Sequence, residues 1–153
     1  METALKLTHI DYHQFLGLHS FQLTFPSKEL LKVDFNYYHF GRIEKGMYYK
    51  NIDVDSVLNI AVNKVHTVAI KPRARDFIDL YFIIQKYHYS IPKLIVLAKT
   101  KFDWHIDSVQ IGSRFLMASE SSDFSRMLKP LDHREWKDFF IAEAWKLKKE
   151  IFK

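Results

Sequence analysis

The spacing of the apolar residues changes once along this chain of 153 residues, close to Asp53. Before that point, residues 21–25 alternate between apolar and polar, Pro26-Ser27 interrupts the pattern, and an extended, aromatic-rich run resumes over residues 30–38. Alternation with a period of two is typical of a strand that buries one face. We therefore expect a β-hairpin or two neighbouring strands in this part of the chain.

After Asp53 the apolar residues recur at intervals of three and four, which is the spacing of one face of a helix. The first helix can be capped by Asp55 or Ser56 and ends before Pro72. The remaining helices cover approximately residues 73–87, 90–102, 108–118 and 133–152. This order of elements predicts an α+β fold that is mostly helical, with a short N-terminal β-hairpin or small sheet followed by a bundle of four to five helices.

We expect one continuous globular domain, because the chain has the length of a single domain and contains neither an internal repeat nor a low-complexity linker. Its β region covers residues 1–52 and its helical region residues 53–153. Within the β region, residues 1–17 show no clear pattern and residues 41–51 read as a loop.

The composition narrows the classes of function. The absence of cysteine excludes a disulfide scaffold and any thiolate metal site, and it favours a reducing, cytoplasmic location. No stretch approaches the roughly 20 apolar residues of a membrane-spanning helix, so we expect no membrane partner. The net charge of +5 is compatible with an RNA or nucleotide partner.

The helix expected over residues 73–87 is apolar around most of its circumference, so its two acids, Asp76 and Asp79, should be at least partly buried. Buried carboxylates need charged or hydrogen-bonding partners. Two interpretations stay open: the acids pair with basic residues and hold the helix in place, or they orient basic residues at a phosphate site. The candidate basic partners are Arg73, Arg75, Lys71 and Lys86.

Two lysines also stand out. Lys64 falls at the edge of the apolar stripe of the first helix, where it either extends its ammonium to solvent or presents a positive charge to a phosphate. Lys32 and Asp34 should point to the same face of a strand, with Val33 on the opposite face. They form either a surface charge pair or a carboxylate and an ammonium presented together, as metal-dependent phosphoryl transfer requires.

These pieces, in this order, resemble the abortive-infection toxin nucleotidyltransferases of the AbiEii/AbiGii type. The most specific stretch is the run from Arg75 to Tyr81, Arg-Asp-Phe-Ile-Asp-Leu-Tyr. The other matching stretches are Lys32-Val33-Asp34, Asn63-Lys64, Ser90-Ile91-Pro92, Lys101-Phe102, Met127-Leu128-Lys129-Pro130 and the closing helix around Trp136. The resemblance covers about residues 20–153.

The resemblance implies a member of the polymerase-β-like nucleotidyltransferase superfamily. Such enzymes use divalent metal, here Mg²⁺, to transfer a nucleotide from a nucleoside triphosphate to an acceptor. In this family the acceptor is tRNA for some members, and a cognate antitoxin protein restrains the toxin.

The resemblance also assigns roles to individual residues. Asp34 would be the third metal-binding acid and a catalytic residue, and Lys32 would bind nucleotide beside it. Lys64 would be catalytic and would contact the triphosphate. The supporting helical motif would comprise Arg75, which also binds nucleotide, together with Asp76 and Asp79.

The first motif of the family is absent from these residues. It consists of Gly-Ser followed about ten residues later by Asp-x-Asp, and its two acids hold the metal pair. Before Lys32 the chain has one glycine, Gly17, which is followed by Leu18, and one aspartate, Asp11.

Two later stretches imitate this motif. Asp53-Val54-Asp55 follows the Lys-x-Asp pair and sits where a helix cap is expected, so we interpret it as part of a cap. Gly112-Ser113 precedes Asp123 by a suitable interval, but Ser125 stands where the second acid belongs. We interpret that pattern as a chance match.

With one metal-binding acid in place of three, we expect no transferase activity from this chain alone. A wrongly assigned start, a degraded gene or a deliberate fragment would each explain the short N-terminus. The truncated sheet should expose an edge, which favours a partner or a homo-oligomer. Two alternatives stay open: a non-catalytic binding module that contacts a protein partner or RNA, and a split enzyme whose Asp-x-Asp comes from a separate chain.

Overall fold

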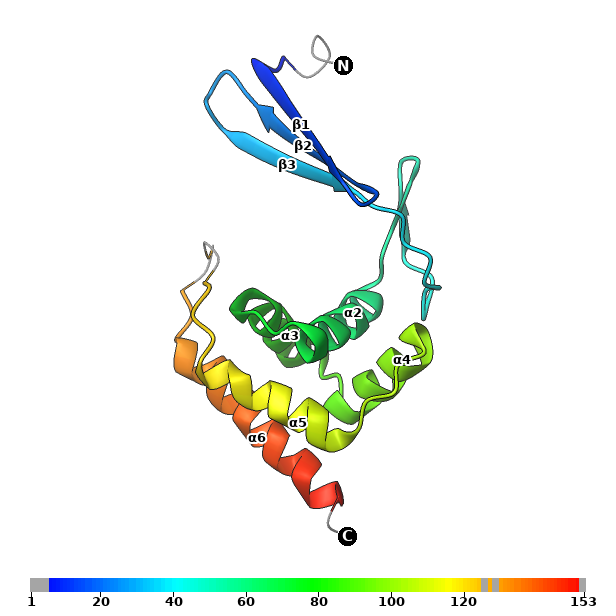
Figure 1. Cartoon of the computed structure of the whole chain (residues 1–153), viewed down its shortest axis with the longest axis vertical. Coiled ribbons are helices and arrows are strands. Elements are labelled where there is room, and N and C mark those ends of the chain that lie inside the picture. Colours follow the sequence, from blue (N-terminus) through cyan, green and yellow to red (C-terminus); the bar gives the residue numbers. More distant parts are fainter. Residues whose placement is uncertain (1–5, 125–126, 128–129, 152–153) are drawn as a thin grey trace. The chain divides into compact units, whose positions relative to one another are not determined.

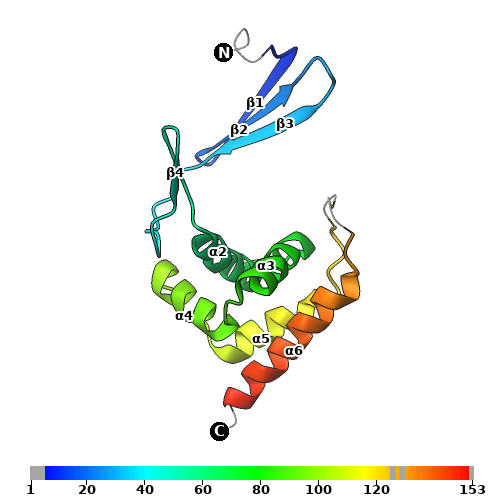
Figure 2. The same cartoon turned by 180° about the vertical axis from the view of Figure 1, so that it is seen from behind.

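The computed structural model describes residues 6–124, 127 and 130–151. The chain forms two compact units, residues 1–39 and residues 40–153. Figures 1 and 2 show that the first unit consists of strands and that helices dominate the second. The α+β class with a helical majority is therefore confirmed. The division at residue 52 and the single continuous domain stay predictions.

The first unit is a three-stranded antiparallel sheet in the order β1-β2-β3. Its strands are β1 (His9–Phe15), β2 (Leu18–Thr24) and β3 (Leu30–Phe35). Strand β1 lies entirely within residues 1–17, where the sequence shows no clear pattern. Leu16 and Gly17 connect β1 to β2 with positive φ angles of 44° and 80°. A two-residue turn with positive φ at both positions matches the twist of a hairpin, and glycine adopts this conformation without strain.

The two faces of this sheet differ in character. Tyr12, Phe21 and Phe35 share one face, where the ring centroids of Tyr12 and Phe21 lie 4.9 Å apart and those of Phe21 and Phe35 lie 5.8 Å apart. Ser20 lies opposite Asp34 in the register of β2 and β3, and both point to the other, polar face. The alternation that predicts the strands therefore also separates an aromatic face from a polar one.

The second unit begins with a hairpin of β4 (Met47–Tyr49) and β5 (Ile52–Val54). The loop expected over residues 41–51 therefore contains a strand, and that expectation is wrong for residues 47–49. The buried side chain of Asn59 holds the preceding segment: the Ile43 N–H donates to Asn59 Oδ1 at 2.7 Å, and Asn59 Nδ2 donates to the Glu44 carbonyl at 2.8 Å. The buried Asn59 amide thus accepts one hydrogen bond and donates another, and together they fix the backbone before the hairpin.

The helices follow the expected order and differ from the expected bounds by a few residues. They are α2 (Val57–Ile70), α3 (Ala74–Tyr87), α4 (Ile91–Phe102), α5 (Ser108–Leu116), the short 3₁₀ helix η1 (Met117–Ser119) and α6 (His133–Ile151). Ser56 caps α2, since its side chain accepts a hydrogen bond from the Asn59 N–H, so Ser56 rather than Asp55 is the cap.

The core of the second unit lies around α3, which contributes the fully buried residues Phe77 and Leu80. The Phe77 ring lies 5.8 Å from the Trp136 ring and 4.9 Å from the Phe140 ring, both on α6. Helices α5 and α6 run side by side, as both views show. Within the described residues, no helix is long and apolar enough to cross a membrane.

Candidate functional site

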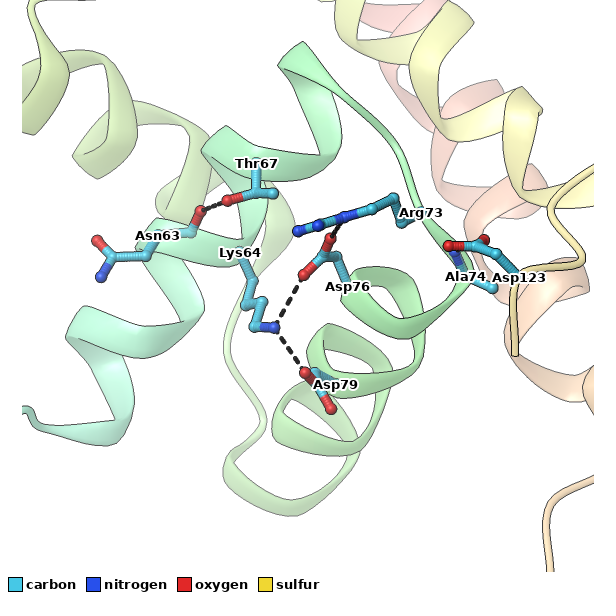
Figure 3. Close-up of polar contacts among 8 residues, drawn as sticks. All are labelled: Asn63, Lys64, Thr67, Arg73, Ala74, Asp76, Asp79 and Asp123. Carbon is cyan, nitrogen blue, oxygen red and sulfur yellow. Dashed lines mark hydrogen bonds and ion pairs between the residues drawn. The ribbon is translucent and has the colours of Figure 1, made fainter. Parts of the chain in front are cut away.

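Lys64 on α2 faces two acids on α3, as Figure 3 shows. The Lys64 ammonium donates to Asp76 Oδ1 at 2.9 Å and to Asp79 Oδ2 at 2.6 Å. Arg73, which precedes α3, donates from Nε to Asp76 Oδ2 at 2.7 Å. We call these four residues the Lys64 cluster. It contains two positive and two negative charges, so it is neutral as a whole.

Burial differs strongly within the cluster. The Asp76 side chain is 3% exposed and binds one cation through each oxygen, whereas the Asp79 side chain is 54% exposed. Burial by itself lowers the pKa of Lys64, but its hydrogen bonds to Asp79 and Asp76 outweigh this effect and raise the pKa above its ordinary value. Lys64 therefore stays charged and joins α2 to α3.

The expected partly buried state holds for Asp76 and does not hold for Asp79. Of the four basic partners considered from the sequence, only Arg73 pairs with an acid of α3. Lys64 supplies the other contacts, from a different helix. Arg75 is exposed, and no ion pair joins it to Asp79 within the described residues, although their spacing permits one.

Asp123 contributes to the same region and was not singled out for this role by the sequence. Its carboxylate accepts a hydrogen bond of 2.7 Å from the Ala74 N–H at the start of α3. A carboxylate at this position satisfies a free N–H and complements the helix dipole. The pattern of Gly112-Ser113 followed by Asp123 resembles the first family motif in sequence only. Gly112-Ser113 lies within α5 and therefore does not form a phosphate-binding turn.

Asp34 lies in the first unit, on strand β3. The Lys32 ammonium lies 3.0 Å from Asp34 Oδ2, which confirms that the two side chains share a face. A hydrogen bond from Ser20 and a second one from Lys32 lower the pKa of Asp34 below its ordinary value. Both charged side chains are well exposed, so the pair is available to solvent.

The sheet offers no second acid beside Asp34. Asp11 lies on β1, and β2 separates it from β3. Because neighbouring strands lie about 4.8 Å apart, the backbones of β1 and β3 are about 10 Å apart, and Asp11 lies in register with Gln22 and Lys32 rather than with Asp34. Nowhere in the described ranges of the chain could three His, Asp or Glu side chains hold one metal ion together. Asp34 therefore stands in the described sheet without the two further acids that the resemblance calls for.

The acids of Asp53-Val54-Asp55 have a structural role, though not as a cap. The Arg42 guanidinium donates from Nε to Asp55 Oδ1 at 2.7 Å, and its Nη1 lies 3.7 Å from Asp53 Oδ2. These contacts raise the pKa of Arg42, chiefly through the hydrogen bond to Asp55. The interpretation of this triplet as a cap is wrong because Ser56 takes that position and both acids bind Arg42.

The chemistry that the Lys64 cluster can perform follows from its unused donors. An ammonium has three protons, and the described partners of Lys64 occupy two of them. The third proton is available to an anion such as a phosphate oxygen. Since Asp79 and Arg75 are both exposed, such an anion can approach from solvent.

Comparison with models of known protein families gives a match. A family model described as "Nucleotidyl transferase AbiEii toxin, Type IV TA system" matches residues 10–147. No curated protein and no solved structure matches the chain at a significant level. Because the family match covers most of the chain, including both the Lys32–Asp34 pair and the Lys64 cluster, this protein belongs to the AbiEii nucleotidyl transferase toxin family.

Proposed function

We propose that this chain is a nucleotide-binding component of a type IV toxin–antitoxin system that does not transfer nucleotides by itself. The observation that carries the proposal is the Lys64 ammonium, held between two helices with one proton that no described residue accepts, in a chain that matches the family over residues 10–147. The proposal includes a cytoplasmic location, a role in abortive infection and an antitoxin partner.

Charge and geometry both support a contact between Lys64 and a phosphate. Asp76 and Asp79 hold the Lys64 ammonium in one place, so binding an anion costs little further side-chain entropy. Arg75 lies one turn before Asp79 on α3 and is exposed, so its guanidinium can reach the same region of solvent. Together they would neutralise part of the charge of a triphosphate, with Asp76 and Asp79 as supporting residues.

The small number of metal-binding acids supports the lack of transfer activity. Of the family's metal site, this chain would retain Asp34 with Lys32 beside it. Asp34 has no second acid beside it in the sheet. Two divalent ions normally stabilise the attacking and leaving oxygens of the transferred group, and one carboxylate does not suffice to hold them. Loss of that stabilisation lowers the rate by several orders of magnitude.

Transfer activity is tested by incubating the purified chain with tRNA, each labelled nucleoside triphosphate in turn, and Mg²⁺. We expect no incorporation of label above the level without protein. Robust incorporation that depends on Mg²⁺ would refute the inactivity. A Lys64→Met variant that abolished such incorporation would still support the assigned role of Lys64.

Nucleotide binding is tested separately by calorimetric titration with ATP in the absence of acceptor. We expect Lys64→Met to weaken binding by at least about tenfold, because a charged hydrogen bond to phosphate is lost. The matched control is Lys93→Met, which removes an exposed lysine of α4 and should leave the affinity unchanged. Equal affinities of wild type and Lys64→Met would overturn the phosphate contact.

A second candidate function is a non-catalytic binding module, and one observation favours it. In the β4–β5 hairpin, the side chains of Met47, Tyr49, Ile52 and Val54 share one face and are all exposed. An exposed apolar face on a short hairpin with unpaired edges favours a protein partner over RNA. Co-elution with a cognate antitoxin, abolished by Tyr49→Asp and kept by Lys45→Asp, would support this function. Unchanged co-elution of Tyr49→Asp would refute it.

A further inference from the structure

Strand β1 forms one edge of the three-stranded sheet, and within the described sheet it pairs on one side only, with β2. The two-residue turn between β1 and β2 makes Phe15 and Leu18 a hydrogen-bonded pair. Such pairs alternate along an antiparallel ladder, so the backbone N–H and C=O groups of Ile10, Tyr12 and Gln14 point away from β2. Outward groups of this kind can pair with a further strand.

The two edges of the sheet differ in how well they resist a further strand. The opposite edge, β3, carries Lys32, and lysine on an edge strand is a common means of preventing pairing. The charge of Lys32 is also already matched, because its ammonium lies 3.0 Å from Asp34 Oδ2. The seven residues of β1 include neither lysine nor proline. Strand β1 is therefore the edge that is open to pairing.

The sequence of β1 is complementary to itself. When two copies of β1 run antiparallel with Tyr12 opposite Tyr12, Asp11 of each copy lies opposite His13 of the other, so the contact occurs twice about a two-fold axis. These are non-hydrogen-bonded pairs, in which the Cα atoms are about 4.5 Å apart and the side chains lie closest. A register centred on Asp11 or on His13 would instead place two like side chains opposite each other.

The side chains of Asp11 and His13 are available for this contact. Asp11 Oδ1 lies 2.9 Å from His9 Nε2 on the same strand, and a carboxylate can accept about four hydrogen bonds, so a second donor can bind. His13 is exposed, and among the residues that the structure describes no acid forms an ion pair with it. Its neighbour in register on β2 is Ser20, which carries no charge.

The other face of the sheet would also gain from this register. Tyr12 lies in register with Phe21, and Phe21 lies in register with Val33, so an apolar row crosses the sheet. The row ends at β1, where Tyr12 is 48% exposed. Pairing at Tyr12 would continue the row into the second copy, and aromatic pairs across strands stabilise a sheet.

We propose that two copies of this chain join through β1, antiparallel and centred on Tyr12, into one sheet that runs through both copies. The occupant of the edge is a second copy because the charges of β1 match those of β1 itself. This contact lies in the first unit and goes beyond the proposed nucleotide function. Its tests need neither nucleotide nor antitoxin.

The first experiment is sedimentation equilibrium of the full chain and of two charge variants. His13→Asp places an acid opposite Asp11 of the other copy, and Asp11→Lys places a lysine opposite His13. Each variant alone should dimerise at least about tenfold more weakly than the wild type, because both copies of the contact are lost. An equimolar mixture should recover the dimer, since the new lysine of one variant then faces the new aspartate of the other.

The matched control is His105→Asp, which makes the same change in charge at a side chain that is 95% exposed and lies outside the sheet. It should dimerise like the wild type and should gain nothing from mixing with Asp11→Lys. Recovery that occurs only with His13→Asp is specific to the two-fold pairing of β1.

The second experiment uses the absence of cysteine from the chain. In the proposed register, Tyr12→Cys places two cysteines opposite each other with Cα atoms about 5.5 Å apart, a distance that a disulfide can bridge. Mild oxidation should therefore give a covalent dimer. Gln14→Cys is the control: it faces Ile10 of the other copy, so its own counterpart is about 13 Å away along the strand and should not cross-link.

A wild type that stays monomeric up to its limit of solubility would overturn the proposal. So would charge variants that dimerise like the wild type, a mixture that associates no better than its components, or equal cross-linking of Tyr12→Cys and Gln14→Cys. If one of the charge variants does not fold, the two cysteine variants still decide the question.

Discussion

The carboxylate of Asp123 accepts a hydrogen bond of 2.7 Å from the backbone N–H of Ala74, a residue 49 positions earlier in the chain. Ala74 is the first residue of α3, and Arg73 before it makes no side-chain cap of its own. The segment before α6 thus supplies the cap that the local sequence of α3 lacks. The start of α3 also carries Asp76, so this contact supports the position of the Lys64 cluster.

We predict that Asp123→Ala lowers the free energy of unfolding of the second unit by about 1 kcal/mol, the usual value of an N-terminal capping side chain. The measurement is urea unfolding followed by tryptophan fluorescence, since all tryptophans lie in residues 40–153 and report on this unit. The control is Ser122→Ala, an exposed neighbour, which should change stability by less than about 0.5 kcal/mol. Equal effects of the two substitutions would contradict the capping role.

Asp76 and Asp79 bind the same ammonium but should differ in their contribution to stability. Asp76→Asn leaves two cations without their buried partner, so we expect a loss of about 3 kcal/mol. Asp79→Asn removes a mostly exposed partner and should cost less than about 1 kcal/mol. Urea unfolding of both variants measures the difference. A larger loss for Asp79→Asn would show that the exposed contact dominates.

The raised pKa of Lys64 predicts a dependence of stability on pH. Burial lowers this pKa, but the hydrogen bonds to Asp79 and Asp76 raise it above the ordinary value of 10.5. The stability that Lys64 contributes is therefore fully present below pH 10.5 and is lost as the pH rises through the higher pKa of the folded state.

The check is the difference in unfolding free energy between the wild type and Lys64→Met, measured from neutral to strongly alkaline pH. Both proteins contain the same tyrosines, so the contribution of tyrosine titration to the unfolding free energy cancels in this difference. We expect it to stay constant up to about the ordinary pKa of lysine and then to shrink. If the difference in unfolding free energy instead grew with pH, the prediction for Lys64 would be contradicted.

Gly46 packs too tightly against β5 to accept a side chain. A Cβ atom at this position would lie 1.8 Å from the carbonyl oxygen of Val54, which belongs to the backbone and cannot rotate away. We predict that Gly46→Ala destabilises the hairpin by about 2 kcal/mol or more and speeds amide exchange in β4 and β5.

Gly41 provides the matched control for this substitution. A Cβ atom there would meet no other atom within 4 Å, so Gly41→Ala should be neutral or stabilising by about 0.5 kcal/mol. Hydrogen exchange followed by NMR distinguishes the two variants. Slow exchange in the hairpin of Gly46→Ala would mean that the backbone of β5 shifts without cost.

The contacts of the candidate site could be predicted from the sequence only where they are local. Lys32 and Asp34 lie two residues apart on one strand, so the period of the strand alone places them together. Arg73 and Asp76 are likewise three residues apart. The pairing of Lys64 with Asp76 joins two helices, and no local spacing distinguishes Lys64 from Arg75 or Lys86 as the partner.

Strands β1, β4 and β5 were not predicted from the sequence, because their residues show no regular alternation of buried and exposed positions. Strand β1 lacks a strong alternation because most of its residues are exposed or half-buried on both faces. The residues of β4 and β5 are all exposed, so no buried face imposes a pattern. The pairing of β4 with β5 across a short turn and the close approach of Gly46 to Val54 become apparent only in three dimensions.

The sequence by itself determined that strands precede the helices, the approximate helix bounds and the family, because periodicity and motifs are properties of neighbouring residues. The tertiary structure decided which charges meet: Lys64 with Asp76 and Asp79, Asp123 with Ala74, and Arg42 with Asp53 and Asp55. These contacts depend on how separate elements pack, because each joins residues that lie far apart in the sequence, and a buried carboxylate such as that of Asp76 needs a charged partner.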